Sequence, residues 1–221
     1  MIKAVLFDFD GVICDTEPQF FEYKLKKMNE MGFPVTREFL LERIGESFRV
    51  MFPREFKVDD PEKYINEYYS GVEHSITNYN KLMFPEVIDL LDYCVSHHLI
   101  CAITSNSKHE RLEAAVKEMN IDKYFSNIYS NESLGVAKPN PLFYTKVLEN
   151  LHLLPEEAIV IEDSVHGIAA AKDANIYTIA KKENYFHIDQ SYADTQIDKL
   201  TEVIDIIEKR MNINKASKLT L

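Results

Sequence analysis

The stretch from Val5 to Thr16 constrains the fold of this chain more than any other. The apolar run Ile2 to Phe9 is too short to cross a membrane and has the length of a buried strand. It leads into two carboxylates, Asp8 and Asp10, and then into Gly11. Because side chains alternate along a strand, we expect both carboxylates to point the same way, where a divalent cation or a shared proton offsets their repulsion. A plain Asp-Gly turn before a helix is the alternative at this point.

From Pro85 onward, the pattern predicts alternating helices and strands. The later strands are expected at Leu99–Ser105, Asn127–Ser130, Ala158–Glu162 and Ile176–Ala180, and the helices at positions beginning with Pro85, Arg111, Pro141, Ala169 and Leu200, before a frayed tail at Asn212–Leu221. This alternation predicts an α/β fold, a doubly wound (Rossmann-like) parallel sheet with right-handed crossovers. Ligands bind such sheets at the carboxyl ends of the strands, so Asp8, Ser105 and Asp163 are expected to meet in one crevice. Lys138 would reach that crevice from a loop.

Residues 17–84 predict an all-helical insertion between the first two strands. Apolar residues recur with helical spacing from Phe20 to Met31, and Asp60-Pro61 has the pattern of a helix start. Two short helical pieces are expected between Glu38 and Phe56. We therefore expect a catalytic core formed by residues 1–16 and 85–221 and a helical cap formed by residues 17–84. The helical spacing of the cap's aromatic residues favours a small cap core over substrate contacts.

Composition and charge exclude several classes of partner. The 221-residue chain is 46% hydrophobic, which supports a well-buried interior, and its net charge is −11. That charge argues against sequence-independent binding to nucleic acid or to an anionic membrane. Its three cysteines lack metal-ligand spacing, and we find no secretion signal or membrane span. We expect a cytoplasmic monomer acting on a small molecule.

Four ordered segments resemble the sequence motifs of the haloacid dehalogenase superfamily. The first is Asp8-Phe-Asp10-Gly followed by Asp15-Thr16, and the second is the strand that ends in Ser105 and continues as Asn106-Ser107. Lys138-Pro139 resembles the third motif and Glu162-Asp163-Ser164 the fourth. A lone Asp-x-Asp is weak evidence, whereas four motifs in order along the whole chain are strong evidence.

The resemblance implies a phosphoryl-transfer site with named roles. Asp8 would attack phosphorus and form an aspartyl-phosphate, and Asp10 would act on the leaving oxygen and then on water as general acid and base. Ser105, Asn106 and Lys138 would hold the phosphate, with Lys138 also steadying Asp8.

The same resemblance implies a magnesium site made of oxygen ligands. The implied ligands are the Asp8 carboxylate, the backbone carbonyl of Asp10 and the Asp163 carboxylate, with Glu162 beside them or acting through water. Hard oxygen donors that leave room for water and phosphate suit Mg²⁺.

Each of these residues also has an ordinary structural interpretation. Ser105 could be a strand-end hydroxyl, and Lys138 a solvated loop lysine. Ser107 to Glu110 has the pattern of a capping box, and Glu162-Asp163-Ser164 has that of a helix start. These interpretations are reasonable one by one and much less so together.

Within the superfamily, Asp15-Thr16-Glu17-Pro18 suggests the branch of sugar-phosphate phosphatases and β-phosphoglucomutases with a helical cap. The mutases carry a histidine where this chain has Phe20, and their cap loop differs around Gly45-Glu46-Ser47, with Arg49 here one place late. We therefore interpret the chain as a phosphatase, with a mutase and a non-catalytic phosphate-binding module as alternatives. Dehalogenases lack the second aspartate that is present here as Asp10. Expected substrate contacts in the cap are Gln19, Glu46, Ser47 and Arg49.

Overall fold

A parallel sheet forms the centre of the computed structural model, which describes residues 1–72, 75–76 and 78–218. Within the described residues the sheet has six strands in the order β3-β2-β1-β4-β5-β6, and all neighbouring pairs are parallel. The strands are β1 (Ala4–Phe7), β2 (Ile100–Ser105), β3 (Asn127–Ser130), β4 (Ala158–Glu162), β5 (Tyr177–Lys181) and β6 (Thr195–Ile197). The predicted doubly wound parallel sheet is confirmed, and the short β6 is an addition that the sequence pattern did not predict.

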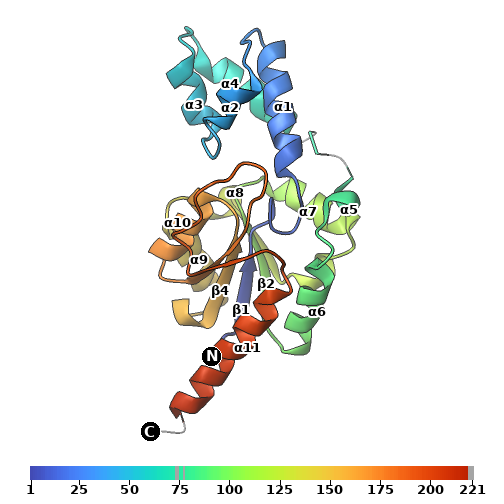
Figure 1. Cartoon of the computed structure of the whole chain (residues 1–221), viewed down its shortest axis with the longest axis vertical. Helices are drawn as coiled ribbons and strands as arrows, with labels where there is room; N and C mark the ends of the chain where they lie inside the picture. The colour runs from blue at the N-terminus through green and yellow to red at the C-terminus, as the bar shows by residue number, and fades with distance from the viewer. Residues whose placement is uncertain (73–74, 77, 219–221) are drawn as a thin grey trace.

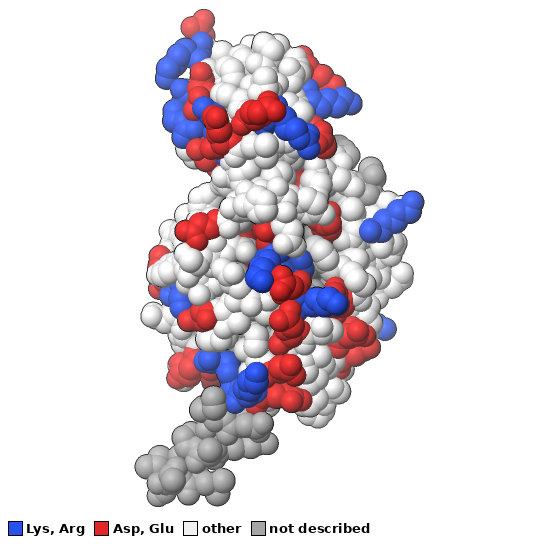
Figure 2. All heavy atoms as spheres, viewed as in Figure 1, with Lys and Arg blue, Asp and Glu red and all other residues white. Residues whose placement is uncertain are grey.

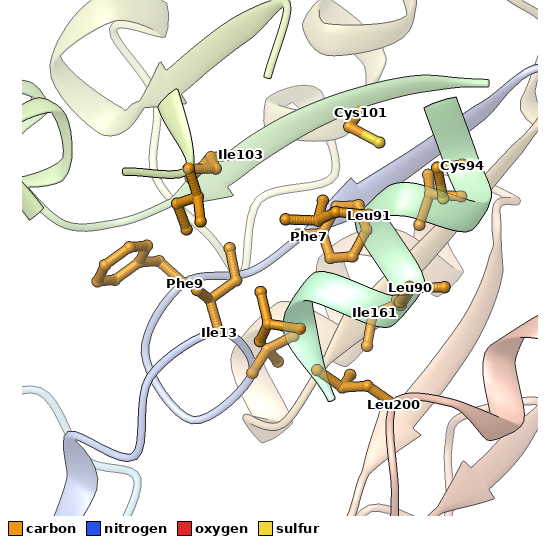
Figure 3. Close-up of a cluster of buried hydrophobic side chains, with 14 of the residues drawn as sticks. Phe7, Phe9, Ile13, Leu90, Leu91, Cys94, Cys101, Ile103, Ile161 and Leu200 are labelled. Atoms are coloured by element: carbon orange, nitrogen blue, oxygen red, sulfur yellow. The ribbon is translucent and has the colours of Figure 1, made fainter. Parts of the chain in front are cut away.

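Helices cover both faces of the sheet. The first face packs against α6 (Val87–Ser96), α7 (His109–Glu118) and α11 (Glu202–Lys218), and the second against α8 (Asn131–Leu134), α9 (Leu142–Leu151) and α10 (Val165–Asp173). The short 3₁₀ turns η1 (Asp122–Tyr124) and η2 (Pro155–Glu157) connect some of these elements. Figure 3 shows the first layer, where Phe7 and Ile161 of the sheet lie beside Leu90 and Leu91 of α6. Because side chains alternate along a strand, successive residues of β1 enter the apolar clusters on opposite faces of the sheet.

The strand register places the carboxyl ends of β1, β2 and β4 side by side. Phe7 lies opposite Ile103 of β2 and Ile161 of β4. Asp8, which follows Phe7, donates its backbone N–H to the Ile161 carbonyl at 2.9 Å. Asp8 therefore leaves the sheet between the ends of β2 and β4, at the edge where the carboxyl ends of the parallel strands meet.

The segment between β1 and β2 is helical. It contains α1 (Glu17–Glu30), α2 (Arg37–Leu41), α3 (Phe48–Glu55), α4 (Pro61–Val72) and α5 (Tyr79–Leu82). In Figure 1 helices α1 to α4 form a separate group above the sheet, while α5 lies beside the core. The upper group has its own apolar cluster, which includes Phe21, Met28, Phe48, Phe52 and Tyr68. We call this group the cap, and its predicted boundaries at residues 17 and 84 stay a prediction.

Two local expectations differ from the structure, and one helix is additional. The capping box at Ser107 is wrong, because α7 has Lys108 at its N-cap and no side-chain cap bond. The hydroxyl of Ser107 is turned toward the site instead, as described below. Helix α11 continues to Lys218, beyond the predicted end at Met211, and residues 219–221 of the predicted tail lie outside the described residues. Helix α5 was not predicted.

Among the helices of the described chain, none has the length and apolar character needed to cross a membrane.

Candidate active site

The site residues that were predicted in the catalytic core gather at the carboxyl edge of the sheet. Asp8, Ser105, Lys138, Glu162 and Asp163 are all buried there. Ser105 and Glu162 are the last residues of β2 and β4, Asp8 and Asp163 follow β1 and β4, and Lys138 comes from the loop before α9. Their convergence follows from the parallel register, since the carboxyl ends of neighbouring strands lie side by side.

Lys138 is the cation at the centre of this group. Its Nζ donates to Asp8 Oδ1 and to the Thr104 carbonyl, each at 2.7 Å, and also to Glu162 Oε1. Burial disfavours the charged amine, but the carboxylates of Asp8 and Glu162 outweigh that penalty and hold the pKa of Lys138 well above its usual value. The lysine therefore stays protonated and fixes the position of the Asp8 carboxylate.

Glu162 has hydrogen-bond donors around both of its oxygens. Oε1 accepts from Lys138 and from the Tyr144 hydroxyl at 3.2 Å. Oε2 accepts from the backbone N–H of Asp163 and from the backbone and hydroxyl of Ser164 at 3.1 to 3.3 Å. A Cβ placed on Gly167 would lie 1.8 Å from Oε1, so the helix start can approach this side chain only with a glycine. Glu162 thus organises Lys138 and the start of α10, and its predicted contact with a metal stays a prediction.

Three carboxylates form a group with the dimensions of a cation site. One oxygen each of Asp8, Glu162 and Asp163 lies within 4.8 Å of the others. Burial is the main cause that raises the pKa values of Asp8 and Asp163 well above the usual range, with neighbouring carboxylates adding to it. The Asp163 carboxylate accepts no hydrogen bond from any residue that the structure describes. An all-oxygen donor set with an uncompensated negative charge fits Mg²⁺.

Gly11 allows this close approach of two segments. Its φ of +78° lies in the left-handed region, and a Cβ there would stand 1.9 Å from Asp163 Oδ2. A side chain at this position would therefore be strained and would displace Asp163. The Asp-Gly turn weighed in the sequence is present, and it also belongs to the carboxylate site.

Asp10 is held by a different set of donors. Thr16 donates its hydroxyl to Oδ1 at 2.7 Å, Ser107 donates to Oδ2 at 2.8 Å, and Arg111 Nη2 also donates to Oδ2. Thr16 is the N-cap residue of α1, yet its side chain makes no cap bond because it is used on Asp10. The sequence assigned no role at the site to Thr16, Ser107 or Arg111, although Thr16 belongs to the first motif and Ser107 to the second.

The side chains of Ser105 and Asn106 make hydrogen bonds that order the loops around the site. Ser105 Oγ accepts the backbone N–H of Ser107 at 3.1 Å. Asn106 Oδ1 accepts the N–H of Lys138 at 2.9 Å, and its Nδ2 donates to the Lys138 carbonyl at 3.1 Å. This pair of bonds fixes the loop that carries the lysine, so Asn106 positions Lys138 whether or not it also contacts a ligand.

A cleft of about 1170 Å³ lies between the cap and this site. Its lining includes the predicted cap residues Glu46, Ser47 and Arg49, together with Asn106 and Lys138 of the core. Gln19 is not among the described residues that line it. Figure 2 shows acidic and basic side chains interspersed over the face of the cap that is turned toward the viewer. Within the cap, Arg49 pairs with Glu62 and Arg54 with Glu46.

The raised carboxyl pKa values predict how stability depends on pH and Mg²⁺. Burial, and next the Asp10 charge, also raise the pKa of Glu17 to about 7. These groups bind protons more tightly in the folded state, so without metal the free energy of unfolding should fall as pH rises from about 5 to 8. Mg²⁺ should stabilise the protein more at the alkaline end. Denaturant unfolding at several pH values, with chelator or with Mg²⁺, measures both effects. Metal-free stability that rises over this range would contradict the assignment.

Comparison with known proteins adds an independent finding. The sequence profile of the family described as haloacid dehalogenase-like hydrolase matches residues 5–181. A phosphorylated carbohydrates phosphatase from Thermotoga maritima is 32% identical over 186 residues, which is 80% of this chain and 84% of that protein. A phosphoglycolate phosphatase from Aquifex aeolicus is 23% identical over 211 residues, covering 95% of this chain and 99% of that protein. The crystal structure of β-phosphoglucomutase from Clostridium difficile has a TM-score of 0.76 at 23% identity and covers 98% of this chain and all of that one, which shows the shared fold.

Proposed function

Since this chain belongs to the haloacid dehalogenase-like hydrolase family, we propose that it is a Mg²⁺-dependent phosphatase acting on a small phosphate monoester, with a sugar phosphate as its substrate class. The observation that carries the proposal is the buried contact of Lys138 Nζ with Asp8 Oδ1 at 2.7 Å, inside a carboxylate group of cation-binding dimensions. When bound there, Mg²⁺ would neutralise the phosphate and the carboxylates, which otherwise repel each other.

In the first half of the proposed reaction, Asp8 is the nucleophile. A carboxylate oxygen of Asp8 attacks phosphorus, the bond from phosphorus to the ester oxygen breaks, and an aspartyl-phosphate forms. Asp10, in its protonated form, gives its proton to the leaving oxygen and releases the alcohol. Lys138 keeps Asp8 in place and faces the phosphoryl oxygens. The residues that would hold Mg²⁺ are Asp8, Asp163 and the backbone carbonyl of Asp10, with Glu162 next to them.

In the second half, Asp10 works as a base. Its carboxylate takes a proton from water, the water oxygen attacks phosphorus, and the bond from phosphorus to Asp8 breaks. The products are inorganic phosphate and free Asp8, and Asp10 is protonated again for the next turnover. The hydroxyls of Thr16 and Ser107 hold the Asp10 carboxyl group in place for both proton transfers.

Phosphatase rather than mutase activity is proposed because of two residues of the cap, Phe20 and Arg49. Phe20 occupies the place of the mutase histidine, and its ring lies 5.3 Å from the Arg111 guanidinium carbon. Arg49 is paired with Glu62 at 2.8 Å, so this part of the cap presents a neutralised pair to a second phosphate group. Both features favour a substrate with a single phosphate.

A reducing, cytoplasmic setting is part of the proposal. Cys14, Cys94 and Cys101 are all buried as free thiols. Free cysteines are expected where the cell keeps thiols reduced. Oligomeric state stays a prediction, with a monomer expected.

The test of this function is turnover of a panel of phosphorylated metabolites, including glucose 1-phosphate and glucose 6-phosphate, beside p-nitrophenyl phosphate. We expect inorganic phosphate release that disappears in chelator and returns with Mg²⁺. A protein that binds phosphate esters without releasing phosphate would be the non-catalytic module. Interconversion of the two glucose phosphates without phosphate release would identify a mutase.

The cap is proposed to select the substrate, and a matched pair of arginines tests this. Arg49 lines the cleft, whereas Arg37 lies elsewhere in the cap, and their side chains are 53% and 52% exposed, each in one ion pair with a glutamate. Arg49→Gln should change the preference among sugar phosphates several-fold, with little effect on p-nitrophenyl phosphate, because the small ester does not reach the cap. Arg37→Gln should change neither. Equal losses on all substrates would make Arg49 a structural residue.

A further inference from the structure

Arg111 is a nearly buried cation that the proposed chemistry does not use. Arg111 is 8% exposed and lies near the start of α7. Nη2 donates to the Asp10 carboxylate and, at 2.6 Å, to Ser107 Oγ, while Nη1 donates to the Tyr79 hydroxyl at 3.2 Å. Both terminal nitrogens therefore donate to partners within the protein, and the residue also lines the cleft between the cap and the core.

The surroundings of Arg111 include both connections between core and cap. The guanidinium carbon lies 5.3 Å from the ring centroid of Phe20, in α1, and 6.0 Å from that of Tyr79, in α5. Helix α1 is the first cap helix after β1, and α5 lies beside the core in the segment that leads from the cap back toward β2. The ring of Phe9, next to Asp10 in sequence, lies 5.5 Å from the same carbon. Arg111 thus contacts Asp10 and both chain segments that carry the cap.

We propose that Arg111 is a positioning residue, which sets the direction of the Asp10 carboxyl group and links it to the two segments that carry the cap. The inference rests on the proposed function, because it gives Arg111 a role only through Asp10. Two hydroxyls converge on the same carboxylate, one of them from an N-cap residue that makes no cap bond. Apolar side chains in place of a buried ion pair often give equal stability. Stability alone therefore does not explain an ion pair to which two hydroxyl groups add further hydrogen bonds. The arrangement is that of a side chain held in one direction.

A double-mutant cycle tests this role, because it isolates the coupling between two residues. Arg111→Met, alone and combined with Asp10→Asn, is assayed with an alkyl phosphate and with acetyl phosphate, whose good leaving group needs little proton donation. Alone, Arg111→Met should slow the alkyl phosphate about 10–100-fold, within the roughly 10²–10⁴-fold that general acid–base catalysis contributes. Formation of the phosphoenzyme from acetyl phosphate should be affected much less. In the Asp10→Asn background, the same change should have no further effect.

Two further variants keep the test decisive. Tyr79→Phe removes only the hydroxyl that fixes Nη1 and should give a smaller slowing with the same dependence on the leaving group, even if Arg111→Met does not fold. Lys117→Met, at the exposed end of α7, is the control and should behave as the wild type. Equal slowing of both substrates, or an undiminished effect in the Asp10→Asn background, would overturn the positioning role. A wild-type protein with neither turnover nor phosphoenzyme would instead overturn the proposed function, and the positioning role with it.

Discussion

Replacing Lys138 by methionine should nearly abolish activity and strongly destabilise the protein. The substitution keeps most of the length of the unbranched side chain and removes the cation that lies between Asp8 and Glu162. Breaking a buried ion pair by deleting one partner leaves uncompensated charge and costs about 3–5 kcal/mol. Losing a preorganised donor to the reacting group costs about 10²–10³-fold in kcat. Denaturant unfolding gives the first quantity, and turnover of p-nitrophenyl phosphate at a temperature where the variant is folded gives the second.

Lys146→Met provides the matched control for this substitution. Lys146 is half-buried on α9, and its Nζ donates to a backbone carbonyl, that of Leu134, at 2.7 Å. Losing one such bond costs about 1 kcal/mol and touches no reacting group. If Lys138→Met were no more damaging than this control, Lys138 would not be the central cation of the site.

The sequence predicted the frame of the site well because that frame depends on local patterns. The apolar run that leads into Asp8 and the run that ends in Ser105 both have the pattern of buried strands in a parallel sheet. Once two such strands are parallel neighbours, their following residues must lie together at one edge. The approach of Asp163 to Gly11 is a consequence of the same geometry.

The side chains around Asp10 could not be predicted in the same way, because their partners are distant in sequence. Ser107 and Arg111 lie 97 and 101 residues from Asp10, and the local pattern around Ser107 favoured a helix cap. The tertiary hydrogen bond to Asp10 replaced the local one. Similarly, no local pattern indicated that Tyr144 and Lys138 would donate to Glu162. Short elements such as β6 and α5 depend on packing more than on pattern, and for that reason the sequence did not predict them.

Substitution of either motif-one aspartate should also have a very large effect, but at different steps. Asp8→Asn has no carboxylate to attack phosphorus, so no phosphoenzyme should form from any substrate. Asp10→Asn loses proton transfer in both halves, which typically costs about 10²–10⁴-fold in each. With acetyl phosphate the leaving group needs little help, so the first half should survive. The second half still needs a base for water, so the aspartyl-phosphate should accumulate.

The most direct measurement is the intact mass of Asp10→Asn after incubation with acetyl phosphate and Mg²⁺. The proposed mechanism predicts one added phosphoryl group, which hydroxylamine removes, as expected for an acyl phosphate. The double variant Asp8→Asn with Asp10→Asn, treated in the same way, should carry none. The same adduct on protein that lacks the Asp8 carboxylate, or normal turnover by Asp8→Asn alone, would contradict the assignment of Asp8 as the nucleophile.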